Sequence, residues 1–474
     1  MTLTYDAKEF YRAHLSRDLR FDGKFFVAVK TTKIYCRPIC PARKAQLKNL
    51  EFFIHKAQAE EAGYRPCMRC RPETAPGSPA WLGTSTTVQR AIRMMDSLAL
   101  EDLSMTRLAE KLGISERWLR ELFQKQVGAN PQSILMLKKL DVARNLLDRS
   151  SLSITDIAFS SGFQSVRRFN AAFKSRFKNT PSAIRSKSLL DGKLHFQLSY
   201  RPPYAWSELL NFFSYRAISH VELVENNSYQ RLIAIDDLHG WFKASITQDN
   251  KIDVEFKVSK SANILEFVAR LKNMFDLDAD PMAIEKCLHE DEKLQPFLKA
   301  HRGLRIPGCW DGFELAVRAI VGQKISVKGA RTILGRIVEI CGAKQTFDES
   351  LPLQRFFPTA NELLHADLSN IGLTGARIAT LKSLAQEIVE KNIILDGTAD
   401  YEATCHRLFA IKGIGPWTVE YIAMRALRNP NSFPETDLKL QKKIARFKLD
   451  PKKWFPWRAY AAILLWNLKL ETDA

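Results

Sequence analysis

The sequence predicts a multidomain protein that is mainly α-helical with small α+β parts. A chain of 474 residues is long enough for roughly three or four domains, each with its own core. Strand-like segments rich in β-branched and aromatic residues are confined to 196–258, and from about residue 264 the pattern is helical. A stretch rich in Pro, Gly, Ser and Thr at 72–86 marks one domain boundary, and a second lies near 186–192, where the strand-like patterns begin.

The positive charge of the chain is concentrated in its first part. Residues 1–190 hold 33 Lys and Arg against 17 Asp and Glu, a net charge of +16, whereas residues 191–474 hold 38 against 35, a net charge of +3. This excess indicates a polyanionic partner for the first part, most simply nucleic acid. A generally basic, solvated surface is the alternative.

Clustered cysteines in this chain favour metal binding over disulfides. No uninterrupted apolar run reaches transmembrane length, and the amino terminus lacks an apolar signal core. We therefore expect a cytoplasmic, nucleoid-associated protein with no membrane partner, in a compartment where disulfides are rare. Four further cysteines lack ligand spacing and are interpreted as ordinary, mostly buried apolar residues: Cys287, Cys309, Cys341 and Cys405.

Four cysteines near the amino terminus form two close pairs, Cys36 with Cys40 and Cys67 with Cys70, separated by 26 residues. Tetrahedral zinc accepts four thiolates at about 2.3 Å, and two close pairs joined by a loop supply that geometry. The spacing predicts one Zn²⁺ held by all four cysteines. It leaves open whether the zinc is only structural or whether a thiolate reacts.

Residues 104–127 and 153–177 each have the pattern of a helix-turn-helix unit. In the first unit Ser104 and Ser115 are predicted to cap the two helices, with Gly113 at the turn, and the second unit repeats this arrangement. Two such units about fifty residues apart let two recognition helices enter successive major grooves on one face of DNA.

The paired form closely resembles the AraC-type DNA-binding domain, over residues 85–187, and implies an all-α double helix-turn-helix domain that binds double-stranded DNA. A single unit would be weak support, because any two short helices can mimic it. The sequence does not separate base contacts from phosphate contacts. The side chains expected on or near the two recognition helices are Arg117, Trp118, Arg120, Gln164, Ser165, Arg167, Arg168 and Asn170.

With that neighbour, residues 1–75 resemble the amino-terminal domain of Ada-type DNA methyl-phosphotriester repair proteins, through 26–32, 35–43 and 63–72. The resemblance implies a zinc-bound α+β domain in which Cys36 accepts the methyl group irreversibly. Zinc keeps cysteines deprotonated, and the thiolate is the nucleophile. Methylating one of four thiolates changes the formal charge of the site from −2 to −1, which should raise the affinity for DNA.

Residues 404–428 predict two helices joined by a tight hairpin at 412–416. Gly413 and Gly415 permit this turn, whose backbone N–H groups can face a phosphate at the start of the second helix. A helix-hairpin-helix contacts the DNA backbone without reading sequence, and many non-enzymatic DNA-binding proteins contain one.

Asp437 follows the hairpin by about twenty residues, a spacing that resembles the helix-hairpin-helix DNA glycosylase superfamily. The wider sequence from about 195 to 470 is similar to the AlkA-type alkylated-base glycosylases. The resemblance implies a small antiparallel sheet domain at 193–275, an all-α glycosylase domain at 276–474, and a monovalent cation at the hairpin when DNA is bound. The supporting segments are Tyr200–Trp206, Arg305–Cys309, Phe313–Gln323 and Trp457–Tyr460.

On this resemblance Asp437 is the catalytic carboxylate, which stabilises the oxocarbenium-like sugar as the glycosidic bond breaks. Bifunctional relatives have a nucleophilic lysine where this chain has Trp417, so a monofunctional enzyme is implied. Trp417, Tyr421 and Trp466 would form an electron-rich pocket for a flipped, positively charged base. Aromatic core packing is the alternative for these residues. Ile306 is a candidate wedge for the gap that the flipped base leaves, with ordinary loop packing as its alternative.

Together these resemblances predict a DNA alkylation repair protein: a DNA-3-methyladenine glycosylase II type enzyme that also accepts methyl groups stoichiometrically at Cys36. Methylation would activate transcription through the helix-turn-helix units, with RNA polymerase as a further partner and a monomer as the expected state. The alternative is mainly a transcriptional regulator with a secondary glycosylase. No Pro-Cys-His-Arg tetrapeptide is present, so repair of O6-alkylguanine is not expected.

Overall fold

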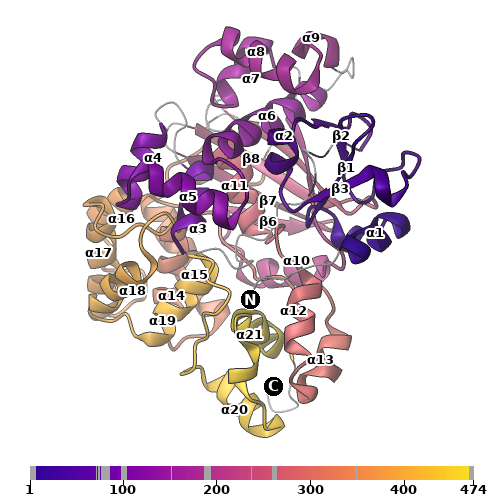
Figure 1. Ribbon diagram of the computed structural model, residues 1–474. Coiled ribbons are helices and arrows are strands. Elements are labelled where there is room, and N and C mark those ends of the chain that lie inside the picture. The colour runs from indigo at the N-terminus through magenta and orange to yellow at the C-terminus, as the bar shows by residue number, and fades with distance from the viewer. Residues whose placement is uncertain are drawn as a thin grey trace.

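The computed structural model describes residues 7–70, 72, 75, 86–97, 104–150, 152–185, 194–235, 238–258, 264–346, 348 and 351–468. We call 7–75 the N-terminal region, 86–185 the helix-turn-helix region, 194–258 the sheet region and 264–468 the C-terminal region. Figure 1 shows the first two regions packed over the sheet, with the C-terminal helices below. The predicted boundary at 186–192 lies outside the described residues, as does most of the one at 72–86.

The N-terminal region is a small α+β unit, as predicted. Its sheet has the strand order β3-β1-β2-β4, antiparallel except for the parallel pair β2 and β4. The parallel pair brings Cys36 and Cys67 to neighbouring strand ends, where the Cys67 N–H donates to the Tyr35 carbonyl at 2.9 Å. The elements are α1 (Ala7–Ser16), η1 (Leu19–Phe21), β1 (Phe26–Val29), β2 (Ile34–Cys36), η2 (Leu47–Asn49), β3 (Leu50–Phe53), α2 (Lys56–Glu61) and β4 (Arg65–Pro66).

The helix-turn-helix region contains both predicted units. Ser104, Ser115 and Ser165 cap their helices by accepting the backbone N–H three residues later, at 3.0–3.3 Å, as the sequence predicts. Gly113 and Gly162 adopt the positive φ of 70° and 81° that the two turns require. The helices are α3 (Thr86–Ser97), α4 (Met105–Leu112), α5 (Glu116–Gln126), α6 (Pro131–Arg149), α7 (Ile154–Ser160), α8 (Val166–Phe177) and α9 (Pro181–Ile184).

The sheet region is a five-stranded antiparallel sheet in the order β5-β9-β8-β7-β6, which confirms the predicted antiparallel sheet. Alternate residues of β9 are buried, because one face of the sheet covers the core. Its elements are β5 (Leu194–Ser199), α10 (Trp206–Arg216), β6 (Glu222–Glu225), β7 (Ser228–Ile235), β8 (Leu238–Ile246) and β9 (Lys251–Val258).

The C-terminal region is helical, as predicted, and has two hydrophobic cores. One forms around α14, α15 and α17, and the other around α20 and α21. The hairpin precedes α19, a helix of the first core, and Asp437 precedes α20, a helix of the second core. The elements are α11 (Ile264–Met274), α12 (Pro281–Leu288), η5 (Glu292–Leu294), α13 (Gln295–Ala300), α14 (Gly312–Val321), α15 (Val327–Cys341), α16 (Ala360–His365), α17 (Gly375–Val389), α18 (Tyr401–Ala410), α19 (Pro416–Arg425), α20 (Leu438–Phe447), η6 (Pro451–Trp454) and α21 (Arg458–Asn467).

Buried polar contacts join the N-terminal region to the C-terminal one. Lys24 and Asp280 form an ion pair at 2.7 Å, with both side chains almost fully buried. Beside it, Arg201 Nε donates to the Asp22 carbonyl at 2.9 Å, and Arg201 itself is fully buried. Burial of these polar groups costs free energy unless each keeps its partner. The contacts therefore hold the two regions in one relative position.

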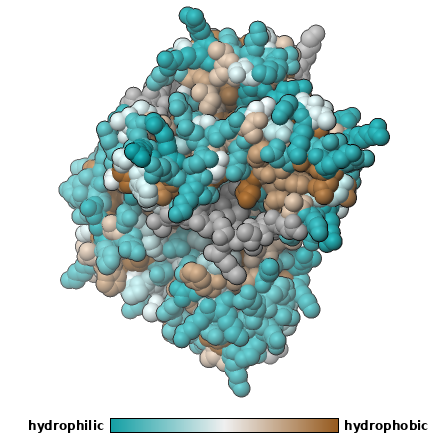
Figure 2. All heavy atoms as spheres, viewed as in Figure 1, coloured by the Kyte–Doolittle hydropathy of each residue, from teal (hydrophilic) through white to brown (hydrophobic). Residues whose placement is uncertain are grey.

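A second network joins the N-terminal region to α8. Arg176 donates to Glu60 at 3.0 Å and to Asp141 at 2.7 Å, and the Tyr35 hydroxyl donates to the same Glu60 at 2.6 Å. Tyr35 directly precedes Cys36, so this network connects the second recognition helix to the residue beside the first cysteine of the cluster. Figure 2 shows a mostly hydrophilic surface on this face, with hydrophobic side chains gathered beside β1 and β3.

Candidate metal centre and aromatic pocket

The four predicted zinc ligands lie together. The sulfur atoms of Cys36, Cys40, Cys67 and Cys70 are all within 4.8 Å of one another. Four ligands at about 2.3 Å around a tetrahedral ion would be about 3.8 Å apart, so the cluster fits one zinc ion without rearrangement of the backbone. The fold thus brings together the four sulfur atoms that the spacing predicts as zinc donors.

Arg37 supports this cluster from the chain segment between its first two ligands. Its backbone N–H donates to Cys70 Sγ at 3.3 Å, and its Nε donates to Asp22 at 2.8 Å. Such outer contacts orient the ligands and moderate their negative charge. Cys36 is 8% exposed and Cys67 is partly exposed, so the geometry gathers the ligands without distinguishing the one that reacts.

The predicted hairpin joins α18 to α19. Gly413 has a φ of +98°, and a Cβ at this position would lie 2.2 Å from Thr380 Oγ1. Gly415 caps α19, with Pro416 as its first residue. Gln323 Nε2 donates to the Gly413 carbonyl at 3.0 Å, which ties the turn between α14 and α15 to the hairpin.

Asp437 is the N-cap of α20, and both of its carboxylate oxygens are positioned. One oxygen accepts the Leu440 N–H at 2.9 Å, and the other accepts Trp417 Nε1–H at 2.8 Å. The side chain therefore points along a fixed direction into an adjoining cavity.

That cavity has a volume of about 320 Å³, within the range of about 300–1,000 Å³ typical of small-ligand pockets. Trp417, Tyr421 and Trp466 all line it, together with Asp437. The Trp417 and Tyr421 rings are stacked with centroids 5.0 Å apart, and Trp466 is tilted 6.1 Å from Tyr421. The first two rings therefore form one stacked aromatic surface at the wall of the cavity.

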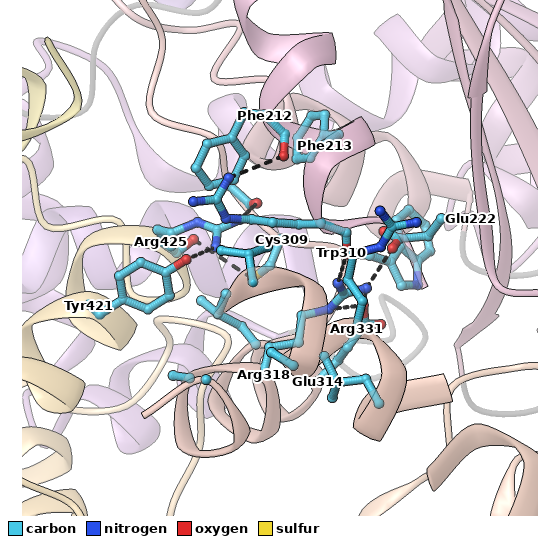
Figure 3. Close-up of a pocket in the computed structure, with 18 of the residues that line it drawn as sticks. Phe212, Phe213, Glu222, Cys309, Trp310, Glu314, Arg318, Arg331, Tyr421 and Arg425 are labelled. Carbon is cyan, nitrogen blue, oxygen red and sulfur yellow. Dashed lines mark hydrogen bonds and ion pairs between the residues drawn. The ribbon is translucent and has the colours of Figure 1, made fainter. Parts of the chain in front are cut away.

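The opposite side of the cavity is charged, which the sequence reasoning missed. Arg231 and Arg318 pair there with Glu222 and Glu314, and all four side chains are largely buried. Figure 3 shows Glu222, Glu314 and Arg318 at one end of the cavity.

At the other end Arg425 lies against Tyr421 and donates to its hydroxyl (Figure 3). Arg216 stacks on Phe212, with its guanidinium carbon 3.8 Å from the ring centroid. Both arginines stand four residues after an aromatic side chain on the same helix, Phe212 for Arg216 and Tyr421 for Arg425. That spacing is the sequence signal that could have found them.

The guanidinium groups create a positive potential in the pocket. Burial raises the pKa of Tyr421, but Arg425, Arg216 and Arg318 outweigh it and bring that pKa below its usual value. The pocket therefore combines an aromatic wall with a cationic end.

Two predictions do not fit the structure. Ile306 is 8% exposed, packs in the core around α21 and does not line the aromatic cavity, so its position does not suit a DNA wedge. The scattered cysteines are partly exposed instead of mostly buried, because each lies at the margin of a core. Cys309 even lines the cavity.

The predicted DNA-reading residues lie on or beside α5 and α8. The side chains of Arg117 and Arg120 are 90% and 57% exposed, and each pairs with a glutamate four residues away. Ser165 uses its hydroxyl as the cap of α8. The other polar side chains expected near α8 are exposed: Gln164, Arg167, Arg168 and Asn170. In the described part of the chain, no helix has the length and apolar character needed to span a membrane.

Three family models match successive parts of the chain. The metal binding domain of Ada matches residues 9–73, a helix-turn-helix domain matches 108–187, and the AlkA N-terminal domain matches 195–311. The chain is 33% identical to the probable bifunctional transcriptional activator/DNA repair enzyme AlkA of Mycobacterium tuberculosis, over 98% of this chain and 96% of the relative.

The second half of the chain has relatives of its own. It is 30% identical to DNA-3-methyladenine glycosylase 2 of Escherichia coli, over 57% of this chain and 96% of that protein. The structure of a 3-methyladenine DNA-glycosylase from Archaeoglobus fulgidus aligns with a TM-score of 0.51 at 21% identity, over 57% of this chain and 96% of that one, which supports the fold. The chain therefore belongs to the family of bifunctional transcriptional activator/DNA repair enzymes that join an Ada-type metal-binding domain and a helix-turn-helix domain to an AlkA-type glycosylase.

Proposed function

We propose that this protein excises alkylated purines such as 3-methyladenine from double-stranded DNA, with Asp437 as the catalytic carboxylate. The observation that carries this proposal is the position of Asp437, fixed by Trp417 and the start of α20 at the wall of an aromatic cavity. The working unit would comprise the predicted domains at 193–275 and 276–474.

In the proposed reaction the flipped base stacks on the aromatic wall formed by Trp417, Tyr421 and Trp466. As the bond between C1′ and the base nitrogen breaks, its electron pair stays with the base, and positive charge develops on the sugar. The Asp437 carboxylate stabilises that charge, and a water oxygen then bonds to C1′. The hydrogen bond to Trp417 leaves the second lone pair of that oxygen available for the sugar.

The proposed enzyme is monofunctional. A Schiff-base route needs a neutral lysine at the pocket, and the family's lysine position holds Trp417. Lys439 also lines the cavity but is exposed, in the first turn of the helix that Asp437 caps. The product would therefore be an abasic site with an intact strand.

The proposed DNA-contacting face includes the hairpin at Gly413 and Gly415, with a monovalent cation when DNA is bound. The turn between α14 and α15 replaces Ile306 as the candidate for insertion into DNA. Gln323 ties this turn to the hairpin, Lys324 is exposed in a left-handed conformation with φ +55°, and Ile325 lines the cavity. The turn therefore stands between the hairpin and the pocket, where an inserted side chain would support the gap.

The excision assay uses duplex DNA with a single alkylated purine and measures release of the base. We expect Asp437→Asn to lower the single-turnover rate about 100-fold or more with little change in duplex affinity. Wild-type protein that releases no more base than Asp437→Asn would refute the glycosylase proposal. Cleavage of the DNA strand without added alkali would refute the monofunctional reaction.

The second proposed activity is irreversible methyl transfer at Cys36. The thiolate sulfur attacks the methyl carbon of a DNA methyl phosphotriester, a carbon–sulfur bond forms, and the carbon–oxygen bond breaks with its electron pair on the phosphate oxygen. Zinc, when bound by the four cysteines, keeps them ionised. Peptide mass spectrometry after incubation with methyl-phosphotriester DNA should find one methyl group on Cys36. A methyl group on Cys67, or none, would contradict this assignment.

Regulation of transcription is the candidate that the Tyr35–Glu60–Arg176 network favours, because it links the strand of Cys36 to recognition helix α8. We propose that methylated protein binds a promoter as a monomer and contacts RNA polymerase. Gel-shift affinity for promoter DNA should rise after methylation, and sedimentation should give the mass of one chain. An affinity that methylation leaves unchanged would exclude this role.

A further inference from the structure

The cavity is lined by more cationic side chains than the carboxylates in its ion pairs can neutralise. Arg231 and Arg318 are neutralised by Glu222 and Glu314. Four more cations line the cavity with no carboxylate at ion-pair distance among the described residues, and Asp437 is the carboxylate of the lining that takes part in none of these ion pairs. These cations are Arg216, Arg331, Arg425 and Lys439.

Two of these cations lie within the pocket, whereas Arg331 and Lys439 are exposed at its rim. Arg425 is 6% exposed and bonds to neutral acceptors, the carbonyls of Pro307 and Gly308 and the Tyr421 hydroxyl. Arg216 stacks on Phe212 and donates to the Phe212 carbonyl at 3.4 Å, and its guanidinium also hydrogen-bonds to the Tyr421 hydroxyl. A guanidinium has five N–H donors, so Arg216 keeps donors for a base in the cavity beyond those that its two protein acceptors use.

This arrangement is unfavourable for a base that already carries positive charge. A cationic ring gains from the aromatic wall but is repelled by the guanidinium groups. A neutral base with carbonyl or ring-nitrogen acceptors gains from both. The aromatic wall alone would have suggested a preference for cations.

We propose that Arg216 is a catalytic residue that stabilises the departing base, whether that base leaves as a neutral molecule or as an anion. The inference rests on the proposed glycosylase function and adds a second group to Asp437. Asp437 acts on the sugar, which becomes positive, and Arg216 acts on the base, which becomes more negative.

The electron and proton balance explains why one arginine serves both kinds of base. Breaking the C1′–N bond leaves its electron pair on the base, so a neutral base departs as an anion and a cationic base departs neutral. Water adds to C1′, and its proton goes to the anionic base or, for the cationic base, to solvent. In both reactions the base gains negative charge on the way to the transition state, where a fixed cation stabilises it.

For a cationic base, the loss of Arg216 should strengthen binding of the base and slow the breaking of its glycosidic bond. Arg216→Met removes a repulsive charge from the bound state and a stabilising charge from the transition state. For a duplex with one 7-methylguanine, we expect the half-saturating enzyme concentration to fall severalfold while the single-turnover rate falls about tenfold. For a duplex with one hypoxanthine, that concentration should rise severalfold and the rate should fall about tenfold or more.

Two variants serve as controls in the full-length protein. Arg216→Lys keeps the charge and should stay near wild type on both duplexes. Arg336→Met removes an arginine of α15 that also donates to a backbone carbonyl, that of Ile371, but lies outside the cavity, and it should change neither rate.

The inference is overturned if Arg216→Met shifts the half-saturating concentration in the same direction for both duplexes, or if Arg216→Lys is as impaired as Arg216→Met. Wild-type protein that releases 7-methylguanine but no hypoxanthine also overturns it. These results differ from failure of the glycosylase proposal, in which wild-type protein and Asp437→Asn release equal amounts of both bases.

Discussion

Trp417 Nε1, on the hairpin helix α19, donates a hydrogen bond at 2.8 Å to Oδ2 of Asp437, the N-cap of α20 twenty positions further along the chain. The contact joins the aromatic wall of the cavity to its carboxylate. The Trp417 ring stacks on Tyr421 at the same time, so one side chain sets the stacking surface and the direction of the carboxylate. The proposed glycosylase chemistry depends on this coupling.

Trp417→Phe separates these two roles of Trp417. The phenyl ring keeps an aromatic surface on Tyr421, but Asp437 loses its N–H donor. A hydrogen bond to a charged group contributes about 1.5–3 kcal/mol, so we expect the single-turnover excision rate to fall about tenfold or more with unchanged duplex affinity. Trp417→Ala should lower both quantities. Equal rates for wild-type protein and Trp417→Phe would mean that the hydrogen bond does not orient Asp437.

Gly413→Ala should strain the hairpin. The φ of +98° disfavours a side chain, and the added Cβ would lie 2.2 Å from Thr380 Oγ1. We expect the free energy of unfolding in urea to fall by about 2 kcal/mol. Gly415→Ala is the matched control, because Gly415 has φ −99° and its Cβ would meet no atom within 4 Å. Similar losses in the two variants would argue against strain at Gly413.

Features of local origin could be predicted from the sequence. Ser104, Ser115 and Ser165 cap helices because the hydroxyl of a residue and an N–H three positions later are brought together by any helix that starts there. Trp417 and Tyr421 face the same cavity because four residues make about one helical turn. The cysteine cluster also follows from two short spacings and one loop.

The charged end of the pocket could not be predicted in this way. Arg216 reaches the cavity from α10, in the sheet region, and meets α19 only through tertiary packing. Ile306 precedes a Pro-Gly pair that is typical of a surface loop. Its side chain nevertheless packs in the core around α21. Burial at such positions depends on which elements pack over the loop, and no local sequence pattern predicts that packing.

Lys24→Met should destabilise the contact between the N-terminal and C-terminal regions. The substitution leaves the Asp280 carboxylate buried without its cation, which typically costs about 3–5 kcal/mol. Asp280 would keep its hydrogen bond from the Ala283 N–H, so the cap of α12 remains. We expect urea unfolding at lower concentration for both regions together. Lys30→Met, at an exposed position, is the control and should change the free energy of unfolding by less than about 0.5 kcal/mol.

Asp276 should make the stability of the protein depend on pH. Burial raises the pKa of Asp276 from 3.8 to about 6, although Arg305 and the hydrogen bonds from Tyr460 and Ile306 lower it. The folded state thus binds the proton more tightly than the unfolded chain does. Its contribution to stability is fully present below about pH 4 and is lost as the pH rises through about 6.

Asp276→Asn removes this titration and keeps an oxygen that can accept from Tyr460 or Ile306. At pH 7.5 we expect the variant to exceed wild-type protein in free energy of unfolding by about 2 kcal/mol, because wild type must ionise a buried carboxyl there. At pH 4, where that carboxyl is protonated, the difference should disappear. Asp249→Asn, at an exposed turn, is the surface control and should change the free energy of unfolding by less than about 0.5 kcal/mol. A gain from Asp276→Asn that is equal at both pH values would show that packing, and not ionisation, separates the two proteins.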